Sequence, residues 1–205
     1  MASAYLSRTP SSDGNLDKFT ISLWLKRSKL GSQQKFLFAG DAVNKQHQLL
    51  FTSADLLQFE FYDGTNNYYL RPNRVFRDTS AWYHIVAVWD TGNATSADRI
   101  KLYVNGTRET SFSAEAQPTQ NLDGFWNDAT YTNYIGTQAS ATQHFDGLMT
   151  HIHLTDGYVY QASDFGETDS TSGIWKPKVN PSVTYGTNGF FLKFANSASL
   201  GLDSS

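Results

Sequence analysis

The stretch Trp82-Tyr-His-Ile-Val-Ala-Val-Trp-Asp90 decides the fold of this chain. It is rich in β-branched and aromatic residues, contains no Gly or Pro, and is apolar on both faces of an extended chain, which indicates a central strand covered on two sides. Working outward, residues 99–105 alternate polar and apolar positions and predict a half-buried strand. Asn105-Gly106 then supplies the left-handed residues of a tight hairpin, so we expect the chain to return over residues 107–112.

Similar runs recur along the chain, separated by turn residues such as Gly, Asp, Asn and Pro. We expect strands over residues 19–26, 35–39, 46–52, 56–62, 68–70, 131–136, 145–154 and 189–194. Residues 1–18 form a turn-rich lead-in, 114–130 a long polar loop, and 158–189 an irregular segment with one helical turn at 161–165. These features predict an all-β fold, a sandwich or barrel, in a single domain over residues 1–205.

The composition narrows the class of protein. A chain of 205 residues can bury a sizeable core as one domain. The net charge of -3 provides no basic field, so we expect no nucleic-acid partner. The absence of cysteine excludes a disulfide framework and a thiolate metal site. No apolar run reaches the roughly 20 residues that span a bilayer, which predicts no membrane insertion.

The N-terminal residues Met1 to Pro10 contain no apolar core of a signal peptide. The low charge content of 17% is nevertheless common in β-rich proteins that work outside cells. A virion component reconciles the two observations, because it is made in the host cytoplasm and released by lysis. A processed fragment of a secreted protein is the alternative.

Five sequence blocks occur in order over residues 19–26, 82–86, 102–106, 134–136 and 145–147. Together they resemble the laminin-G-like, concanavalin A-like lectin/glucanase jelly rolls. The end segments resemble the laminin-G-like domains in structural proteins of marine bacteriophages; these segments are residues 5–12, 165–177, 190–194 and 199–205. The resemblance implies a sandwich of two antiparallel sheets, one of them concave. It does not imply a function, because this scaffold carries lectins, hydrolases and purely structural modules.

The glucanases of this superfamily place paired carboxylates on one strand in the motif Glu-x-Asp-x-x-Glu, which supplies nucleophile and general acid. This chain lacks the motif, and its nearest match, Glu167-Thr-Asp169, lies in a segment expected to be a loop. Its four glutamates are scattered; they are Glu60, Glu109, Glu115 and Glu167. We therefore expect no enzymatic activity.

Metal ligation has two weak sequence signals. His151 and His153 are two residues apart on a predicted strand, so their rings would leave the same face, as in metal-binding pairs. The interpretation we favour is a pair of neutral histidines that form hydrogen bonds or pack against a neighbouring chain, because no third ligand is evident. Four aspartates at strand ends could hold calcium, although turn formation is the usual role of such residues: Asp41, Asp63, Asp90 and Asp98. We expect no cofactor, with calcium as the alternative.

Sugar binding needs exposed aromatic rings that stack on pyranose faces, with amides or carboxylates beside them for the hydroxyl groups. Two aromatic segments meet this description. Their candidate residues are Asn67, Tyr68, Tyr69, Trp126, Asn127 and Tyr131. The same side chains could equally form a packing or subunit contact.

The leading hypothesis is a non-catalytic bacteriophage virion protein, part of a capsid decoration, tail or fibre. Its expected partners are other virion proteins, further copies of itself and host surface glycans. Many copies on one particle would turn a weak contact into useful adhesion. A soluble carbohydrate-binding lectin module is the second hypothesis, and a glycoside hydrolase is the third.

Overall fold

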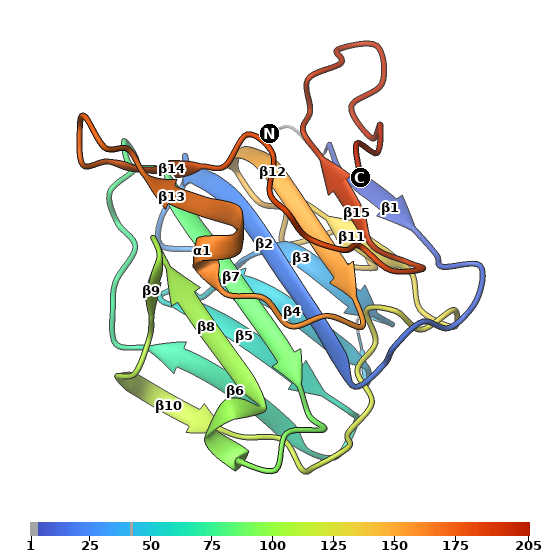
Figure 1. Cartoon of the computed structure of the whole chain (residues 1–205). Coiled ribbons are helices and arrows are strands. Elements are labelled where there is room, and N and C mark those ends of the chain that lie inside the picture. The colour runs from blue at the N-terminus through green and yellow to red at the C-terminus, as the bar shows by residue number, and fades with distance from the viewer. Residues whose placement is uncertain (1–3, 42) are drawn as a thin grey trace.

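The computed structural model describes residues 4–41 and 43–205, and its regular secondary structure is almost wholly β-strand. Two large antiparallel sheets pack face to face, and the main hydrophobic core lies between them (Figure 1). The predicted all-β jelly roll of two antiparallel sheets is confirmed.

In each sheet the strands lie in a different order from their order along the chain, as expected for a jelly roll. The seven-stranded sheet contains, in spatial order, β1 (Leu6–Arg8), β11 (Asn133–Ile135), β3 (Gln34–Gly40), β4 (Gln46–Phe51), β5 (Leu57–Tyr62), β6 (Asn67–Pro72) and β10 (Phe112–Ala116). The six-stranded sheet contains β15 (Phe190–Leu192), β12 (Gly147–Asp156), β2 (Lys18–Arg27), β7 (Tyr83–Asp90), β8 (Ile100–Val104) and β9 (Thr107–Arg108). A short 3-10 helix, η1 (Ser96–Asp98), precedes β8.

The stretch that decides the fold becomes β7, which lies between β2 and β8. Its six inner residues, 84–89, are all buried, which confirms a strand covered on both faces. The hairpin after β8 is also confirmed, because Asn105 and Gly106 have φ angles of 48° and 85°.

The return from this hairpin is shorter than expected. Only β9, two residues long, pairs with β8. The chain then leaves the six-stranded sheet, and Phe112–Ala116 joins the edge of the other sheet as β10, beside β6. The Asn105-Gly106 turn predicted that the chain returns beside β8, but not how soon it leaves for the other sheet.

The segment after β12 covers the outer face of the six-stranded sheet. It contains α1 (Ala162–Phe165), which confirms the predicted helical turn, and also a hairpin of β13 (Gly166–Thr168) and β14 (Trp175–Pro177) (Figure 1). The expectation of an irregular segment over 158–189 was therefore wrong at this hairpin. Ala162 and Phe165 form a second apolar cluster with Val86 and Val88.

His84 of β7 connects the segment after β12 to the six-stranded sheet. Its ring stacks on Trp24 at 4.8 Å between centroids and is fully buried. The indole N–H of Trp175 donates to His84 Nδ1 over 3.0 Å, so the ring proton resides on Nε2 and faces Ser22 Oγ at 2.9 Å. Burial lowers the pKa of His84 to about 3. The histidine is thus a neutral link between β2, β7 and β14.

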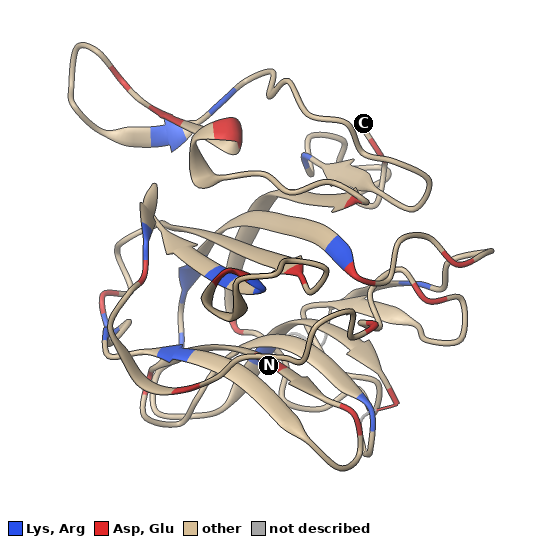
Figure 2. Cartoon of the chain, turned by 60° about the horizontal axis from the view of Figure 1, so that its bottom comes forward, with Lys and Arg blue, Asp and Glu red and all other residues tan. Residues whose placement is uncertain are grey.

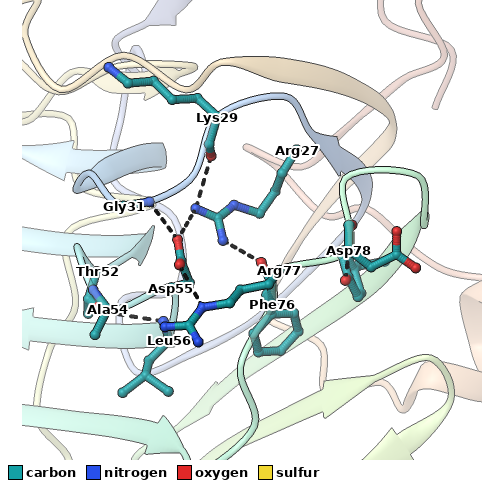
Figure 3. A network of polar contacts seen from close by, with 11 residues as sticks. Arg27, Lys29, Gly31, Thr52, Ala54, Asp55, Leu56, Phe76, Arg77 and Asp78 are labelled. Atoms are coloured by element: carbon teal, nitrogen blue, oxygen red, sulfur yellow. Dashed lines mark hydrogen bonds and ion pairs between the residues drawn. The ribbon is translucent and has the colours of Figure 1, made fainter.

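A buried ion pair ties the ends of the two sheets together (Figure 3). The Arg27 guanidinium, from β2, donates to the Asp55 carboxylate over 3.0 Å and to the Phe76 carbonyl over 2.5 Å. Asp55 lies in the β4–β5 turn and also accepts from the N–H of Gly31 and from Arg77. Burial alone would raise the pKa of Asp55, but these donors outweigh it and hold the pKa below its usual value.

Charges of both signs are interspersed over the chain (Figure 2). Most of the other ion pairs are surface contacts, such as Arg108 with Asp98 at 2.8 Å. Within the described residues, no helix is both long and apolar enough to cross a bilayer.

Candidate functional site

A row of polar side chains covers the outer face of the seven-stranded sheet. In β4 and β5, residues such as Leu49 and Phe59 enter the core, so their alternate neighbours point outward. We call these outward residues the polar face; they are Lys35, Gln46, Gln48, Gln58, Glu60, Asn67, Tyr69 and Arg71. The regular pairing of β3 to β6 brings them side by side.

Glu60 is the centre of the polar face. One carboxylate oxygen accepts from the amides of Gln48 and Gln58 over 2.9 and 2.7 Å, and the other accepts from Asn67 over 2.8 Å. Gln58 also accepts from Arg71 Nε over 2.6 Å. These bonds fix the side chains before any ligand arrives, which lowers the entropic cost of binding.

Lys35 forms the β3 side of the same network. Its ammonium donates to Gln138 over 2.5 Å and lies 5.2 Å above the ring of Phe38. Burial lowers the pKa of Lys35 to about 8, and the negative charge of Glu60 opposes this effect. Lys35 therefore carries most of its positive charge at pH 7 and stays attached to the network.

Two of the predicted ligand residues lie on the polar face. Asn67 is exposed and Tyr69 is half-buried, both on β6. Tyr68 points the other way, because it packs against the core and stacks on Phe61 at 6.3 Å between centroids. The alternation of β6 therefore separates Tyr68 from its two predicted companions.

The second predicted segment does not form an exposed aromatic surface. Trp126 is 1% exposed and belongs to the main core, and Asn127 is buried, with its amide donating to the Asn15 carbonyl. Tyr131 packs on Phe125 at 4.6 Å between centroids. The expectation that Trp126 and Asn127 offer a sugar-binding surface was wrong, because the loop between β10 and β11 turns its aromatic residues into the sandwich.

We expect Trp126→Ala to destabilise the fold rather than to remove a ligand contact selectively. Truncating a fully buried aromatic side chain costs about 3–5 kcal/mol of unfolding free energy. Urea unfolding of the variant beside Tyr69→Ala, which changes a half-buried residue, measures the difference. Unchanged stability together with lost glycan binding would restore Trp126 as a surface contact.

The four aspartates proposed for calcium serve mainly as local acceptors. Asp41 accepts from three backbone N–H groups, of residues 43–45, and Asp63 accepts from those of 65 and 66. Asp90 accepts from the Asn93 amide, and Asp98 pairs with Arg108. Within the described residues, no cluster of three or more His, Cys, Asp or Glu could hold a metal. Turn formation accounts for Asp41 and Asp63.

The two predicted strand histidines do not follow simple alternation. His151 has a φ of 48° and lies in a bulge of β12, where pairing with β2 shifts between Thr150 and His153. His153 is buried, stacks on Phe191 at 3.9 Å and forms a 2.9 Å hydrogen bond with the Tyr185 hydroxyl. Burial lowers the pKa of His153 to about 3, so the ring is neutral and hydrogen-bonded, and it packs within its own chain rather than against a neighbouring one.

Most of the polar face was missed by sequence reasoning. Its signal was present, because the outward positions of β4, β5 and β6 repeat polar residues at a spacing of two. The missed residues are Lys35, Gln46, Gln48, Gln58, Glu60 and Arg71. These polar residues lie side by side only because the three strands pair in a particular register. The register cannot be inferred without knowing which strands pair.

The laminin G-type family model described as the concanavalin A-like lectin/glucanases superfamily matches residues 2–162. The chain therefore belongs to this superfamily. No curated protein matched the sequence.

Three solved structures show the same fold at low identity. A heptameric SAP-like pentraxin from Limulus polyphemus has 13% identity and a TM-score of 0.55, covering 91% of this chain and 87% of the pentraxin. Domain 4 of the arabinanase AbnA from Geobacillus stearothermophilus, in complex with arabinotriose, has 18% identity and a TM-score of 0.52, covering 73% and 66%. Domains LG4-5 of mouse laminin alpha1 have 10% identity and a TM-score of 0.53, covering 93% and 44%.

Proposed function

We propose that this chain is a non-catalytic structural protein of a bacteriophage particle that binds glycans through its polar face. The observation that carries the glycan-binding part is the hydrogen-bonded row of amides around Glu60, with Tyr69 beside it. Amides and a carboxylate match the donors and acceptors of sugar hydroxyls, and an aromatic ring matches a pyranose face. The same fold accompanies an oligosaccharide in the arabinanase domain, which was solved with arabinotriose.

The distribution of acids supports binding rather than cleavage. Glycoside hydrolysis generally requires two carboxyl groups about 5–10 Å apart across the bond that breaks. Across β1, β11, β3, β4, β5 and β6, Glu60 is the single acidic residue. Glu115 of β10 pairs with the inward residue Leu70, so it lies on the other side of the sheet. Glu60 therefore has no acidic partner on these strands.

The virion part of the proposal rests on the resemblance of the end segments to laminin-G-like domains of marine phage structural proteins. On a particle, many copies would act together, so that weak single-site binding becomes strong attachment. A soluble lectin module is the alternative, because it would use the same polar face without a particle.

Replacing Tyr69 tests the glycan-binding site. We expect Tyr69→Ala to weaken binding on a glycan array by roughly ten- to hundredfold, since a stacked aromatic supplies much of the contact with a sugar ring. Trp82→Ala is the matched control, because Trp82 is a 40% exposed aromatic next to β7 of the other sheet. Equal loss in both variants, or no binding by the wild type, would contradict the proposed site.

Two further measurements test the remaining parts of the proposal. Incubation with laminarin, agarose or carrageenan should yield no new reducing ends, and turnover of any of them would contradict the non-catalytic assignment. Antibody against the chain should detect it at fixed stoichiometry in purified phage particles. Its absence from particles, with glycan binding retained, would favour the soluble lectin.

A further inference from the structure

One arginine of the polar face differs from all others in the described chain. Of the seven arginines, four pair with a carboxylate, namely Arg27, Arg74, Arg77 and Arg108. Arg8 and Arg99 donate their terminal nitrogens to backbone carbonyls. Arg71 instead uses only Nε, which donates to Gln58, and its two terminal nitrogens have no partner among the described residues. The two terminal nitrogens of Arg71 thus remain as parallel hydrogen-bond donors, and no carboxylate of the described residues pairs with its positive charge.

The surface beside Arg71, toward the edge strand β10, is not covered by a long side chain. On β6, Tyr69 and Arg71 point to the same outer side, and the Arg71 guanidinium carbon lies over one face of the Tyr69 ring, 5.7 Å from its centroid. Their partners on the edge strand β10 are Ala116 and Ala114, which share this side of the sheet. Because alanine ends at Cβ, no long side chain of β10 screens the tyrosine ring or the guanidinium from that direction. We call the surface formed by Asn67, Tyr69, Arg71, Ala114 and Ala116 the β6–β10 shelf.

We propose that the β6–β10 shelf binds sugars that carry an anionic substituent, a carboxylate or a sulfate ester, with Arg71 as the residue that recognises the anion. This inference rests on the proposed glycan-binding function and names its ligand class. A planar guanidinium with two free donors matches two oxygens of a carboxylate or sulfate. The sugar ring lies on Tyr69, and the exposed Asn67 amide oxygen, which has no partner among the described residues, accepts from a hydroxyl group.

The geometry of the network supports the recognition role. Gln58 holds Arg71 through Nε, and Glu60 in turn holds Gln58, so the guanidinium is oriented before binding. Glu60 is separated from Arg71 by Gln58, and all three of its bonds come from neutral amides. Because Arg71 forms no ion pair with Glu60, its positive charge can pair with an external anion.

Binding of matched pairs of oligosaccharides by the full chain tests this inference. One pair is a carrageenan oligosaccharide with its desulfated form, and a second is an oligogalacturonate with its methyl ester. We expect the wild type to prefer the charged member of at least one pair, and this preference to weaken as salt rises. The pair that shows the preference identifies sulfate or carboxylate as the substituent.

The variants separate recognition of the anion from binding of the sugar. Arg71→Gln should weaken binding of the charged member roughly ten- to hundredfold and binding of the neutral member by much less, because it removes a charge-assisted pair of hydrogen bonds that only the charged member forms. Arg71→Lys should recover only part of the loss. Arg108→Gln, which removes an exposed charge from the other sheet, is the matched control. Thermal unfolding confirms that each variant is folded.

The outcomes distinguish this inference from the proposed function. Equal affinity of the wild type for charged and neutral members, or equal effects of Arg71→Gln and Arg108→Gln, would overturn the anion site and leave glycan binding intact. An equal loss of binding to both members in Arg71→Gln would also overturn it, because Arg71 would then be a structural part of the face. If neither pair nor any arrayed glycan binds, the proposed function and this inference fail together.

Discussion

Lowering the pH from 7 to 5 is expected to remove roughly 6 kcal/mol of unfolding free energy, about 2 kcal/mol for each of three buried histidines. These are His47, His84 and His153, each at most 2% exposed. Burial lowers the pKa of His84 and of His153 to about 3 and that of His47 well below its ordinary value. The folded chain therefore keeps all three rings neutral across this range.

The sign follows from proton binding. In the unfolded chain the three rings have pKa values of about 6.5 and take up protons below that pH, whereas the folded chain does not. Their contribution to stability is complete above about pH 6.5 and is lost as the pH falls toward 3. Asp55, whose pKa is lowered in the folded chain, acts in a different window, because its contribution is lost only below the unfolded carboxyl pKa of about 4.

Urea unfolding at pH 7, 6 and 5 measures this effect. The free energy should fall by about 4 kcal/mol per pH unit near pH 5, the slope for three protons. His84→Gln should reduce the slope by one proton. Ser22→Ala, which removes the hydrogen-bond partner of His84 without removing a titrating group, should lower stability and keep the slope. A slope of one proton or less in the wild type would contradict the assignment of three neutral buried rings.

Asp55→Asn is expected to cost about 3–5 kcal/mol of unfolding free energy, because it leaves a buried guanidinium without its counter-charge. The side chain of Arg27 is 0% exposed, and Asp55 is its only carboxylate partner among the described residues. Asparagine keeps the size of the side chain and tolerates the φ of 63° at this turn, so the change isolates the charge. The urea midpoint, with an unchanged dependence on urea, measures the loss.

A surface ion pair serves as the control for this prediction. Asp98 pairs with Arg108, and both side chains are more than a third exposed. Asp98→Asn should cost less than about 1 kcal/mol, because water already screens the pair. Similar losses in the two variants would show that the Arg27–Asp55 contact does not tie the sheets together.

Much of the fold was predictable because it depends on local alternation. The strands β2, β4, β5 and β7 and the Asn105-Gly106 turn follow from patterns within a few residues. The hairpin of β13 and β14 was not predicted, because its strands are three residues each and its main anchor, Trp175, bonds to a histidine 91 positions away. The bulge at His151 also needs knowledge of its partner strand β2.

The candidate site was less predictable for a related reason. An aromatic residue in a polar segment indicates either a surface contact or an anchor, and Trp126 proved to be an anchor in the core. Asn67 and Tyr69 were found because they combine an amide with an aromatic ring within one run. No such combination surrounds Glu60 or Arg71 in the sequence. Their role in the site depends on the amides that the pairing of β4, β5 and β6 places around them.

A nuclear magnetic resonance titration of the ¹⁵N-labelled chain with the tightest-binding oligosaccharide tests the central claim most directly. The side-chain amide signals of Gln48, Gln58 and Asn67, which all bond Glu60, should shift. Those of Asn127 and Asn133, whose amides donate to backbone carbonyls outside the polar face, should not, and the sugar should be recovered intact. Shifts confined to the six-stranded sheet, or a shortened sugar after the titration, would contradict a non-catalytic glycan site on the polar face.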